Sequence, residues 1–128
     1  MIRVEVVDAS VVVAMVFAEP DSEILARQLE GCHLIAPTLM PYEVANALWV
    51  KTRRDSGRRD VLFEQFRDFL DVPFERCEVD LEEAAEVGLQ HGLTVYDASY
   101  IWLAVNRNAG LVTLDRQMAR VASIVLAK

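Results

Sequence analysis

The stretch Val-Glu-Val-Val-Asp-Ala-Ser, residues 4–10, decides the fold of this chain. Val4 to Val7 is a short β-branched run, which is typical of a strand buried in a parallel sheet. The strand ends at Asp8, and the apolar stretch Val11–Phe17 that follows predicts a short helix capped by Asp8 or Ser10. A buried strand followed by a helix indicates the start of a β-α-β unit.

The rest of the chain continues this alternation. Predicted strands that follow the first are His33–Ala36, an irregular Val72–Phe74, Leu111–Leu114 and a final Ser123–Leu126. Predicted helices cover Glu23–Glu30, Thr38–Arg54, Arg59–Leu70, Leu81–His91, Tyr96–Asn108 (terminated by Gly110) and a short segment from Asp115 to Arg120. We therefore expect a three-layer α/β/α sandwich with a central parallel sheet of four or five strands and about seven helices. Residues 1–128 are expected to form a single domain.

Composition favours an intracellular globular protein. Apolar residues make up 53% of the 128 residues, enough for a substantial core. The longest apolar run, Val11–Ala18, is too short to cross a bilayer, and Glu5 and Asp8 argue against a signal peptide. The two cysteines and two histidines show no zinc-binding spacing, so reduced thiols are expected. These features predict a soluble cytoplasmic protein.

Four acidic residues stand out because each follows or interrupts an apolar segment. Asp8, Asp97 and Asp115 each have an ordinary structural alternative, since all three can cap or open a predicted helix. Glu43 has no such alternative, because its helical neighbours Leu39 and Ala47 are apolar. An ionised Glu43 needs a cationic partner, which is either a distant arginine or a metal ion.

Taken together, the four carboxylates indicate a metal site. Asp8 and Asp115 both lie at the carboxyl ends of predicted parallel strands, where α/β sheets place their ligand crevice. Four converging carboxylates would repel one another without a cation. Oxygen-only ligands favour Mg²⁺ or Mn²⁺ over zinc, and four acids suit a pair of ions. Ser10 and Thr113 could orient the ligands or a bound water.

The sequence resembles the PIN-domain ribonucleases, most closely the VapC-type toxins of toxin–antitoxin pairs. The resemblance spans essentially the whole chain, in order and spacing. It rests on Val-Val-Asp8-Ala-Ser, Pro-Tyr-Glu43-Val-Ala-Asn-Ala-Leu, Tyr-Asp97-Ala-Ser-Tyr-Ile-Trp-Leu-Ala and Leu-Val-Thr113-Leu-Asp115.

This resemblance implies a PIN-like sandwich and a metal-dependent endoribonuclease. In it, Asp8, Glu43, Asp97 and Asp115 are the acidic metal-binding and catalytic set, Thr113 is the accompanying hydroxyl, and the metal is Mg²⁺ or Mn²⁺. It also implies hydrolysis of an RNA phosphodiester without a side-chain nucleophile, a homodimer and a VapB-like antitoxin. In similar proteins a groove near residues 11–29 receives an antitoxin segment, so exposure of Met15 or Phe17 would be informative.

The negative net charge opposes strong nonspecific RNA binding. The chain has 20 acidic and 13 basic residues, a net charge of −7; without the four candidate ligands, 16 acidic residues leave −3. RNA binding must therefore be local. The candidate RNA-binding residues are Arg53, Arg54, Arg58, Arg59 and Arg116, with Lys51 and Arg120 beside them. The alternative for the cluster at residues 51–59 is a solvated helix end favoured by the macrodipole.

Other functions remain open at this point. A receiver-like Mg²⁺-binding signalling domain would pair clustered acids with a late lysine, but Asp8 has no acidic neighbour and the lysines are Lys51 and Lys128. A phosphatase of the haloacid dehalogenase type would need Asp-x-Asp, and Ser10 stands in the second place. A non-toxin PIN-domain nuclease and a metal-free binding module are further alternatives.

Overall fold

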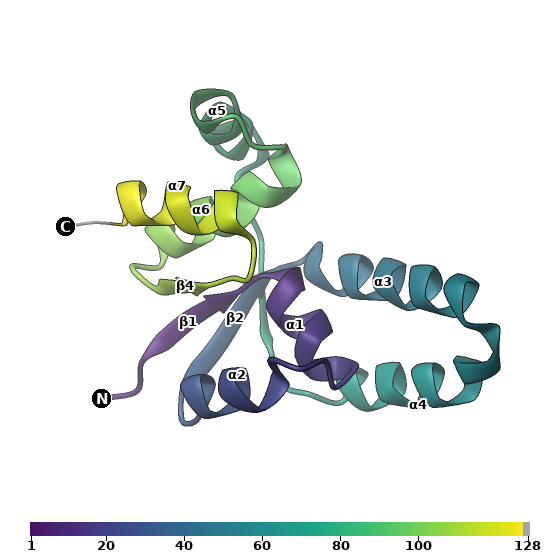
Figure 1. The fold of residues 1–128 in the computed structure, drawn as a ribbon. Helices are drawn as coiled ribbons and strands as arrows, with labels where there is room; N and C mark the ends of the chain where they lie inside the picture. Colours follow the sequence, from purple (N-terminus) through teal and green to yellow (C-terminus); the bar gives the residue numbers. More distant parts are fainter. Residues whose placement is uncertain (127–128) are drawn as a thin grey trace.

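In the computed structural model, which describes residues 1–126, a parallel sheet lies between two layers of helices (Figure 1). These residues form four strands and seven α-helices, so the predicted α/β/α sandwich is confirmed. The strands are β1 (Val4–Val7), β2 (His33–Pro37), β3 (Glu75–Cys77) and β4 (Gly110–Val112). One layer holds α1 (Ala9–Val16), α2 (Ser22–Leu29), α3 (Met40–Arg54) and α4 (Arg59–Leu70), and the other holds α5 (Leu81–His91), α6 (Val95–Asn106) and α7 (Arg116–Val125).

The order of the strands creates the place where a site can form. The sheet runs β3-β2-β1-β4, with Val6 of β1 opposite Ile35 of β2 on one side and Leu111 of β4 on the other. The chain therefore moves outward from β1 through β2 to β3 and then returns to the opposite side of β1 for β4. The direction in which strands are added to the sheet therefore reverses between β1 and β4. Ligands of α/β sheets bind at the carboxyl ends of the strands at such a switch point.

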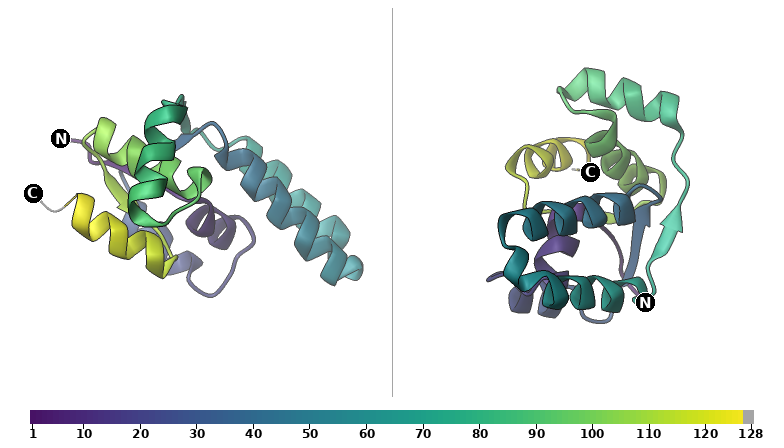
Figure 2. Two further views of the ribbon diagram at one scale, coloured as in Figure 1. Left: turned by 90° about the horizontal axis from the view of Figure 1, so that it is seen from above. Right: turned by 90° about the vertical axis from the view of Figure 1, so that its right-hand side faces the viewer.

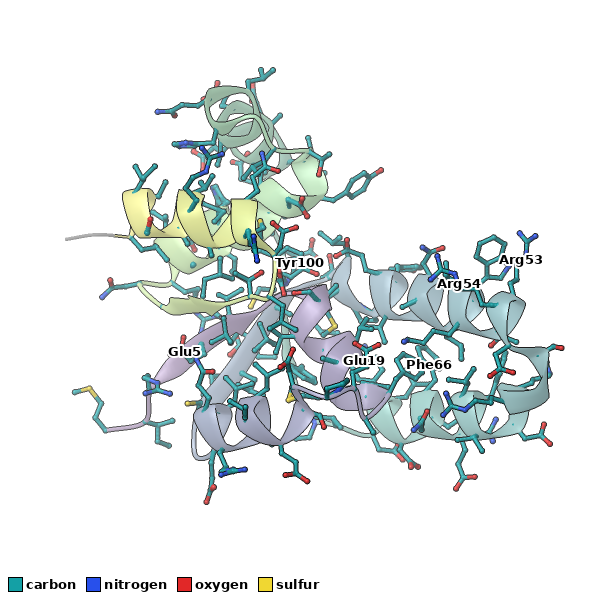
Figure 3. All side chains as sticks on the ribbon, viewed as in Figure 1. Glu5, Glu19, Arg53, Arg54, Phe66 and Tyr100 are labelled. Carbon is teal, nitrogen blue, oxygen red and sulfur yellow. The ribbon has the colours of Figure 1, made fainter. Side chains whose placement is uncertain are left out.

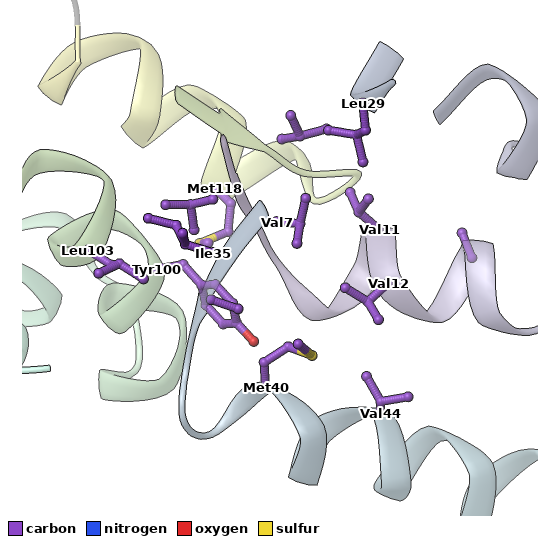
Figure 4. Close-up of a cluster of buried hydrophobic side chains, with 14 of the residues drawn as sticks. Val7, Val11, Val12, Leu29, Ile35, Met40, Val44, Tyr100, Leu103 and Met118 are labelled. Carbon is purple, nitrogen blue, oxygen red and sulfur yellow. The ribbon is translucent and has the colours of Figure 1, made fainter. Parts of the chain in front are cut away.

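The core packs on both faces of the sheet and reaches the edge where the site lies. Val7 and Ile35 are fully buried in the central strands, as is Met40 at the start of α3. Tyr100 of α6 is 1% exposed, and its ring stands among these side chains with its hydroxyl directed toward the start of α3 (Figure 4). This tyrosine thus places a polar atom at the boundary between the core and the sheet edge.

Two predictions near the carboxyl end of the chain are wrong. Ser123–Leu126 is not a strand: α7 continues to Val125, because Met118 and Val121 bury one helical face that Ala122 and Val125 extend. Gly110 does not end α6 but begins β4. The chain reverses instead at Asn108, which adopts a φ of 51°.

The third strand is displaced from its predicted position. It covers Glu75–Cys77 instead of Val72–Phe74. Pro73 has no backbone N–H to contribute to a ladder, so pairing with β2 begins only after it, with Glu75 opposite Ile35.

Helices α3 and α4 form an antiparallel hairpin that projects beyond the sheet (Figure 2). A 3₁₀ turn at Ser56–Arg58 joins them at its tip. Among the described residues, no helix has both the length and the apolar character that crossing a membrane requires.

Candidate functional site

Asp8 is the most buried carboxylate of the site. It follows β1 directly, is 5% exposed and caps α1, with its Oδ1 accepting the Val11 N–H at 3.2 Å. The hydroxyl of Ser10 donates to the same oxygen at 2.6 Å, and that of Thr113 donates to Oδ2 at 2.5 Å. Burial raises the pKa of Asp8, these hydrogen bonds oppose the rise, and the charge of Asp115 adds to it.

Ser10 and Thr113 also hold the segment after β4 against Asp8. The Ser10 hydroxyl accepts the Leu114 N–H at 3.0 Å, and the Thr113 hydroxyl accepts the Asp115 N–H at 3.0 Å. Each hydroxyl therefore donates to Asp8 and accepts from the chain that leads into α7. Asp115 caps α7 through its Oδ1, which accepts the Met118 N–H at 2.9 Å. This network fixes Asp115 beside the switch point.

Glu43 lies in the first turn of α3, and Tyr100 provides its partner. The Tyr100 hydroxyl donates to Glu43 Oε1 at 2.5 Å. Burial raises the pKa of Glu43, the tyrosine lowers it, and the charges of Asp97 and Asp8 raise it further. The sequence prediction offered an arginine or a metal and missed this residue. A signal was present, because Tyr100 stands three positions after Asp97 on one helix face.

Asp97 lies in the first turn of α6. Its N–H donates to the capping Thr94 hydroxyl at 3.2 Å, which is one of the two hydrogen bonds of a capping box. Partial burial raises the pKa of Asp97, and the charges of Asp115 and Asp8 raise it further. Asp8, Glu43 and Asp97 therefore each bear a neighbouring negative charge, and these repulsions link them with Asp115.

This arrangement fits a hydrated divalent ion better than a tight protein cage. Within residues 1–126, no three acidic, histidine or cysteine side chains are gathered closely enough to form a ready metal cluster. Mg²⁺ needs no such cluster, because it keeps several waters and takes only one or two carboxylates directly. An all-oxygen donor set with uncompensated repulsion suits Mg²⁺ or Mn²⁺. The assignment of the four residues as ligands stays a prediction.

An open cleft of about 630 Å³ adjoins these residues. Glu43 and Ser10 contribute to its wall, so the cleft opens directly beside the acidic groups. The remaining lining residues come from α1, α3 and the start of α6: Ala9, Val13, Leu39, Tyr42, Asn46 and Tyr96.

The candidate RNA-binding arginines lie in two places. Arg116 follows Asp115 directly in the sequence and is exposed. Arg53 and Arg54 lie at the outer end of α3 (Figure 3). The guanidinium carbon of Arg53 lies 4.9 Å from the centre of the Trp49 ring. Ten residues of helix separate Arg53 from Glu43, a rise of about 15 Å. Arg58 and Arg59 are farther along, at the tip of the hairpin.

Lys51 is engaged elsewhere. It pairs with Glu19 and lies 5.4 Å from the centre of the Phe17 ring. It therefore links α3 to the turn after α1. It does not belong to the exposed basic residues at the hairpin tip.

Comparison with known proteins gives consistent matches over the chain. Residues 6–124 match the family model described as PIN domain. Ribonuclease VapC3 of Pyrobaculum aerophilum is 39% identical over 121 residues, covering 89% of this chain and 91% of that protein. Exonuclease VapC9 of the same organism is 35% identical over 86 residues, covering 60% of this chain and 58% of that protein. A crystal structure of PAE2754 from Pyrobaculum aerophilum matches with a TM-score of 0.67 and 29% identity, covering 99% of this chain and 96% of that one.

Proposed function

Because the chain belongs to the PIN domain family, we propose that it is a metal-dependent endoribonuclease and the toxin of a VapBC-type toxin–antitoxin pair. The observation that carries the proposal is that the fold brings Asp8 after β1, Glu43 at the start of α3, Asp97 at the start of α6 and Asp115 after β4 close enough for their negative charges to repel one another. Such repulsion is costly in a partly buried site unless a cation compensates it.

In this proposal the four carboxylates hold Mg²⁺ or Mn²⁺. Divalent ions in such a site activate a water for attack on the phosphodiester and stabilise the developing negative charge. The chain's own groups position the ligands: Ser10 and Thr113 fix Asp8, and Tyr100 fixes Glu43. Hydrogen-bond donors held in this way limit the conformations of a carboxylate before a metal binds.

Helix capping and metal binding are compatible in these aspartates. Asp115 caps α7 through Oδ1 alone, which leaves Oδ2 available to a metal. Asp8 Oδ2 accepts one hydrogen bond, and a carboxylate oxygen has a second lone pair. The structural alternative for these residues therefore describes part of their role and does not exclude the proposed one.

In this proposal, arginine side chains bind the RNA substrate through its phosphates. Arg116, which directly follows Asp115, would contact the RNA near the cleaved bond. Arg53, Arg54, Arg58 and Arg59 would contact a longer RNA that follows α3 toward the hairpin tip. Because each phosphate contact releases counterions, RNA affinity should fall with increasing salt.

The antitoxin would occupy a second hollow, of about 350 Å³, between α1, α4 and the segment that leads to β3. Met15 is half-buried and lines it, whereas Phe17 is 6% exposed and belongs to the core. Its lining is mainly apolar and includes Val12, Val16, Leu34, Phe69, Val72 and Phe74. A homodimer and a cytoplasmic location complete the proposal.

The alternatives have less support. A receiver-like domain needs a lysine in its acidic pocket; Lys51 pairs with Glu19 instead, and Lys128 lies outside the described residues. A non-toxin PIN-domain nuclease would share the site and the chemistry. It differs in having no effect on growth when the gene is expressed and no partner encoded beside it.

The experiment is cleavage of single-stranded RNA by the purified protein, with Mg²⁺ or Mn²⁺ and with excess chelator. Wild type should cleave only with metal. Asp97→Asn should be folded, as shown by circular dichroism, and should lose cleavage at least a hundredfold. Glu64→Gln removes an exposed acid of α4 and is the matched control, which should cleave like wild type. Cleavage that persists in chelator, or in Asp97→Asn, would contradict the proposal.

A further inference from the structure

Two exposed tyrosines flank the cleft beside Glu43. Tyr42 of α3 is 80% exposed, and Tyr96 of α6 is 65% exposed. Both line the cleft of about 630 Å³ that also contains Glu43. Each tyrosine directly precedes a candidate metal ligand, Glu43 in one helix and Asp97 in the other. Two large aromatic side chains in solvent at the entrance of one cleft require an explanation that core packing does not supply.

The lining of the cleft suits a base attached to a charged backbone. Three of its lining residues are apolar: Ala9, Val13 and Leu39. Its polar groups are few, and Asn46 among them stands one turn after Tyr42 on α3. An amide that both donates and accepts can bind the edge of a base. Apolar walls with a few directed polar groups are typical of small-molecule and nucleotide sites.

We propose that Tyr42 and Tyr96 form a base-binding subsite, in which unpaired bases next to the cleaved phosphate stack on the two rings and Asn46 contacts a base edge. This inference rests on the proposed ribonuclease function and assigns specificity-determining residues within it. Stacking tolerates any base, because every base has a π-face. A base inside a duplex has both faces covered, so the subsite selects single-stranded RNA.

RNA accounts for this cleft better than a protein segment does. A second copy of the chain, or an apolar peptide, would cover Glu43 and Asn46 with carbon and leave the negative charge of Glu43 without a compensating cation, because Tyr100 supplies only a neutral hydrogen bond. An RNA backbone with its divalent counterions would compensate the charge of Glu43 and Asp97, while its bases would contact the apolar lining residues of the cleft. Because each tyrosine directly precedes a candidate ligand in the sequence, the proposed stacked bases belong to nucleotides near the reacting bond.

The test compares cleavage of two probes in Mn²⁺: single-stranded RNA of about 12 nucleotides with random sequence, and an abasic ribose-phosphate chain of the same length. Tyr42→Ala and Tyr96→Ala should each lower kcat/KM for the base-bearing RNA by about fivefold to hundredfold. The same substitutions should change kcat/KM for the abasic chain by less than about twofold. Tyr42→Phe and Tyr96→Phe keep the rings and should retain wild-type rates.

Leu89→Ala is the matched control for loss of an exposed apolar side chain, since Leu89 of α5 is 87% exposed and lies outside the cleft. It should leave both rates unchanged. Equal losses on both probes, or no loss on either, would overturn the subsite while wild-type cleavage upholds the proposed function. A wild type that cleaves neither probe would overturn both. If Tyr42→Ala changes the molar mass measured by analytical ultracentrifugation and lowers kcat/KM for neither probe selectively, the cleft is a protein interface and the subsite is overturned.

Discussion

Thr113 donates its hydroxyl to Asp8 across 105 positions of sequence, with 2.5 Å between Thr113 Oγ1 and Asp8 Oδ2. The same hydroxyl accepts the N–H of Asp115 at 3.0 Å. One side chain thus joins a buried carboxylate after β1 to the segment after β4. Loss of the Thr113 hydroxyl should therefore affect both the stability of the fold and the arrangement of the site.

Thr113→Val keeps the shape of the side chain but removes the hydroxyl. It leaves a buried carboxylate oxygen and a backbone N–H without their partner, so the free energy of unfolding should fall by about 1–3 kcal/mol. Thr113→Ser should restore most of it. Thr52→Val is the control, because the Thr52 hydroxyl is buried without a hydrogen-bond partner among the described residues and its loss should be neutral or stabilising. Urea unfolding measures all three; equal effects at both positions would contradict the assigned role.

Tyr100→Phe should change the pH dependence of metal binding. The Tyr100 hydroxyl lowers the pKa of Glu43 while burial raises it, so the substitution leaves the pKa higher than in wild type. A protonated Glu43 cannot hold a divalent ion. Mn²⁺ affinity measured by calorimetry should therefore fall more at about pH 5.5 than at about pH 8. A loss of the same size at both values would mean that Tyr100 acts on packing alone.

Glu75 stabilises the fold in a pH-dependent way. Hydrogen bonds from Arg107, at 2.6 Å, and from His33, at 2.6 Å, lower the pKa of Glu75 to about 2. A carboxyl whose folded-state pKa is depressed stabilises above its unfolded pKa, and that stability is lost as the pH falls through the folded value. Glu75→Gln should therefore destabilise at neutral pH, and the difference from wild type should shrink between about pH 4.5 and pH 2.

The control is Glu78→Gln, which removes an exposed carboxylate from the same segment. Its effect on the free energy of unfolding should be small at every pH. A difference between Glu75→Gln and wild type that stays constant from neutral pH to about pH 3 would refute the role of the Arg107–Glu75 pair.

Gly88 is required where α5 packs against the start of α6. A Cβ at this position would lie 2.6 Å from the carbonyl oxygen of Leu93, and backbone cannot yield as a side chain does. Gly88→Ala should lower the free energy of unfolding by about 1–3 kcal/mol. Gly57→Ala in the hairpin turn is the matched control, because the nearest atom to its Cβ is 3.5 Å away, and it should be neutral or slightly stabilising. Thermal unfolding separates the two.

Much of the fold could be predicted from the chain because local signals and the tertiary structure agree. The run that ends at Asp8 predicted a buried strand and a capped helix, and Gly92, with a φ of 71°, ends α5 as its type suggests. The end of α7 could not be predicted in the same way. Ile124 and Val125 are β-branched and suggest a strand, but the burial of Met118 and Val121 decides for a helix. Packing against other elements outweighs weak local propensity.

The candidate site was predictable in its acids and in the hydroxyls of Ser10 and Thr113, but not in Tyr100, which supports Glu43. Carboxylates in apolar surroundings are conspicuous in sequence, and Glu43 could be noticed on that ground alone. Its partner Tyr100 lies 57 positions away in another helix, and only the folded chain brings the two together. Lys51 shows the reverse case: it looked like part of a basic cluster, yet its contact with Glu19 depends on how α3 crosses the turn after α1.

The most direct test of the central claim is an anomalous difference map from crystals grown with Mn²⁺. The account predicts a peak at the switch point between β1 and β4, within about 2.0–2.4 Å of at least one oxygen of Asp8, Glu43, Asp97 or Asp115. The peak should be absent from crystals of Asp97→Asn grown in the same way. A fully occupied Mn²⁺ at another place, with no metal bound to any of these four carboxylates, would contradict the account.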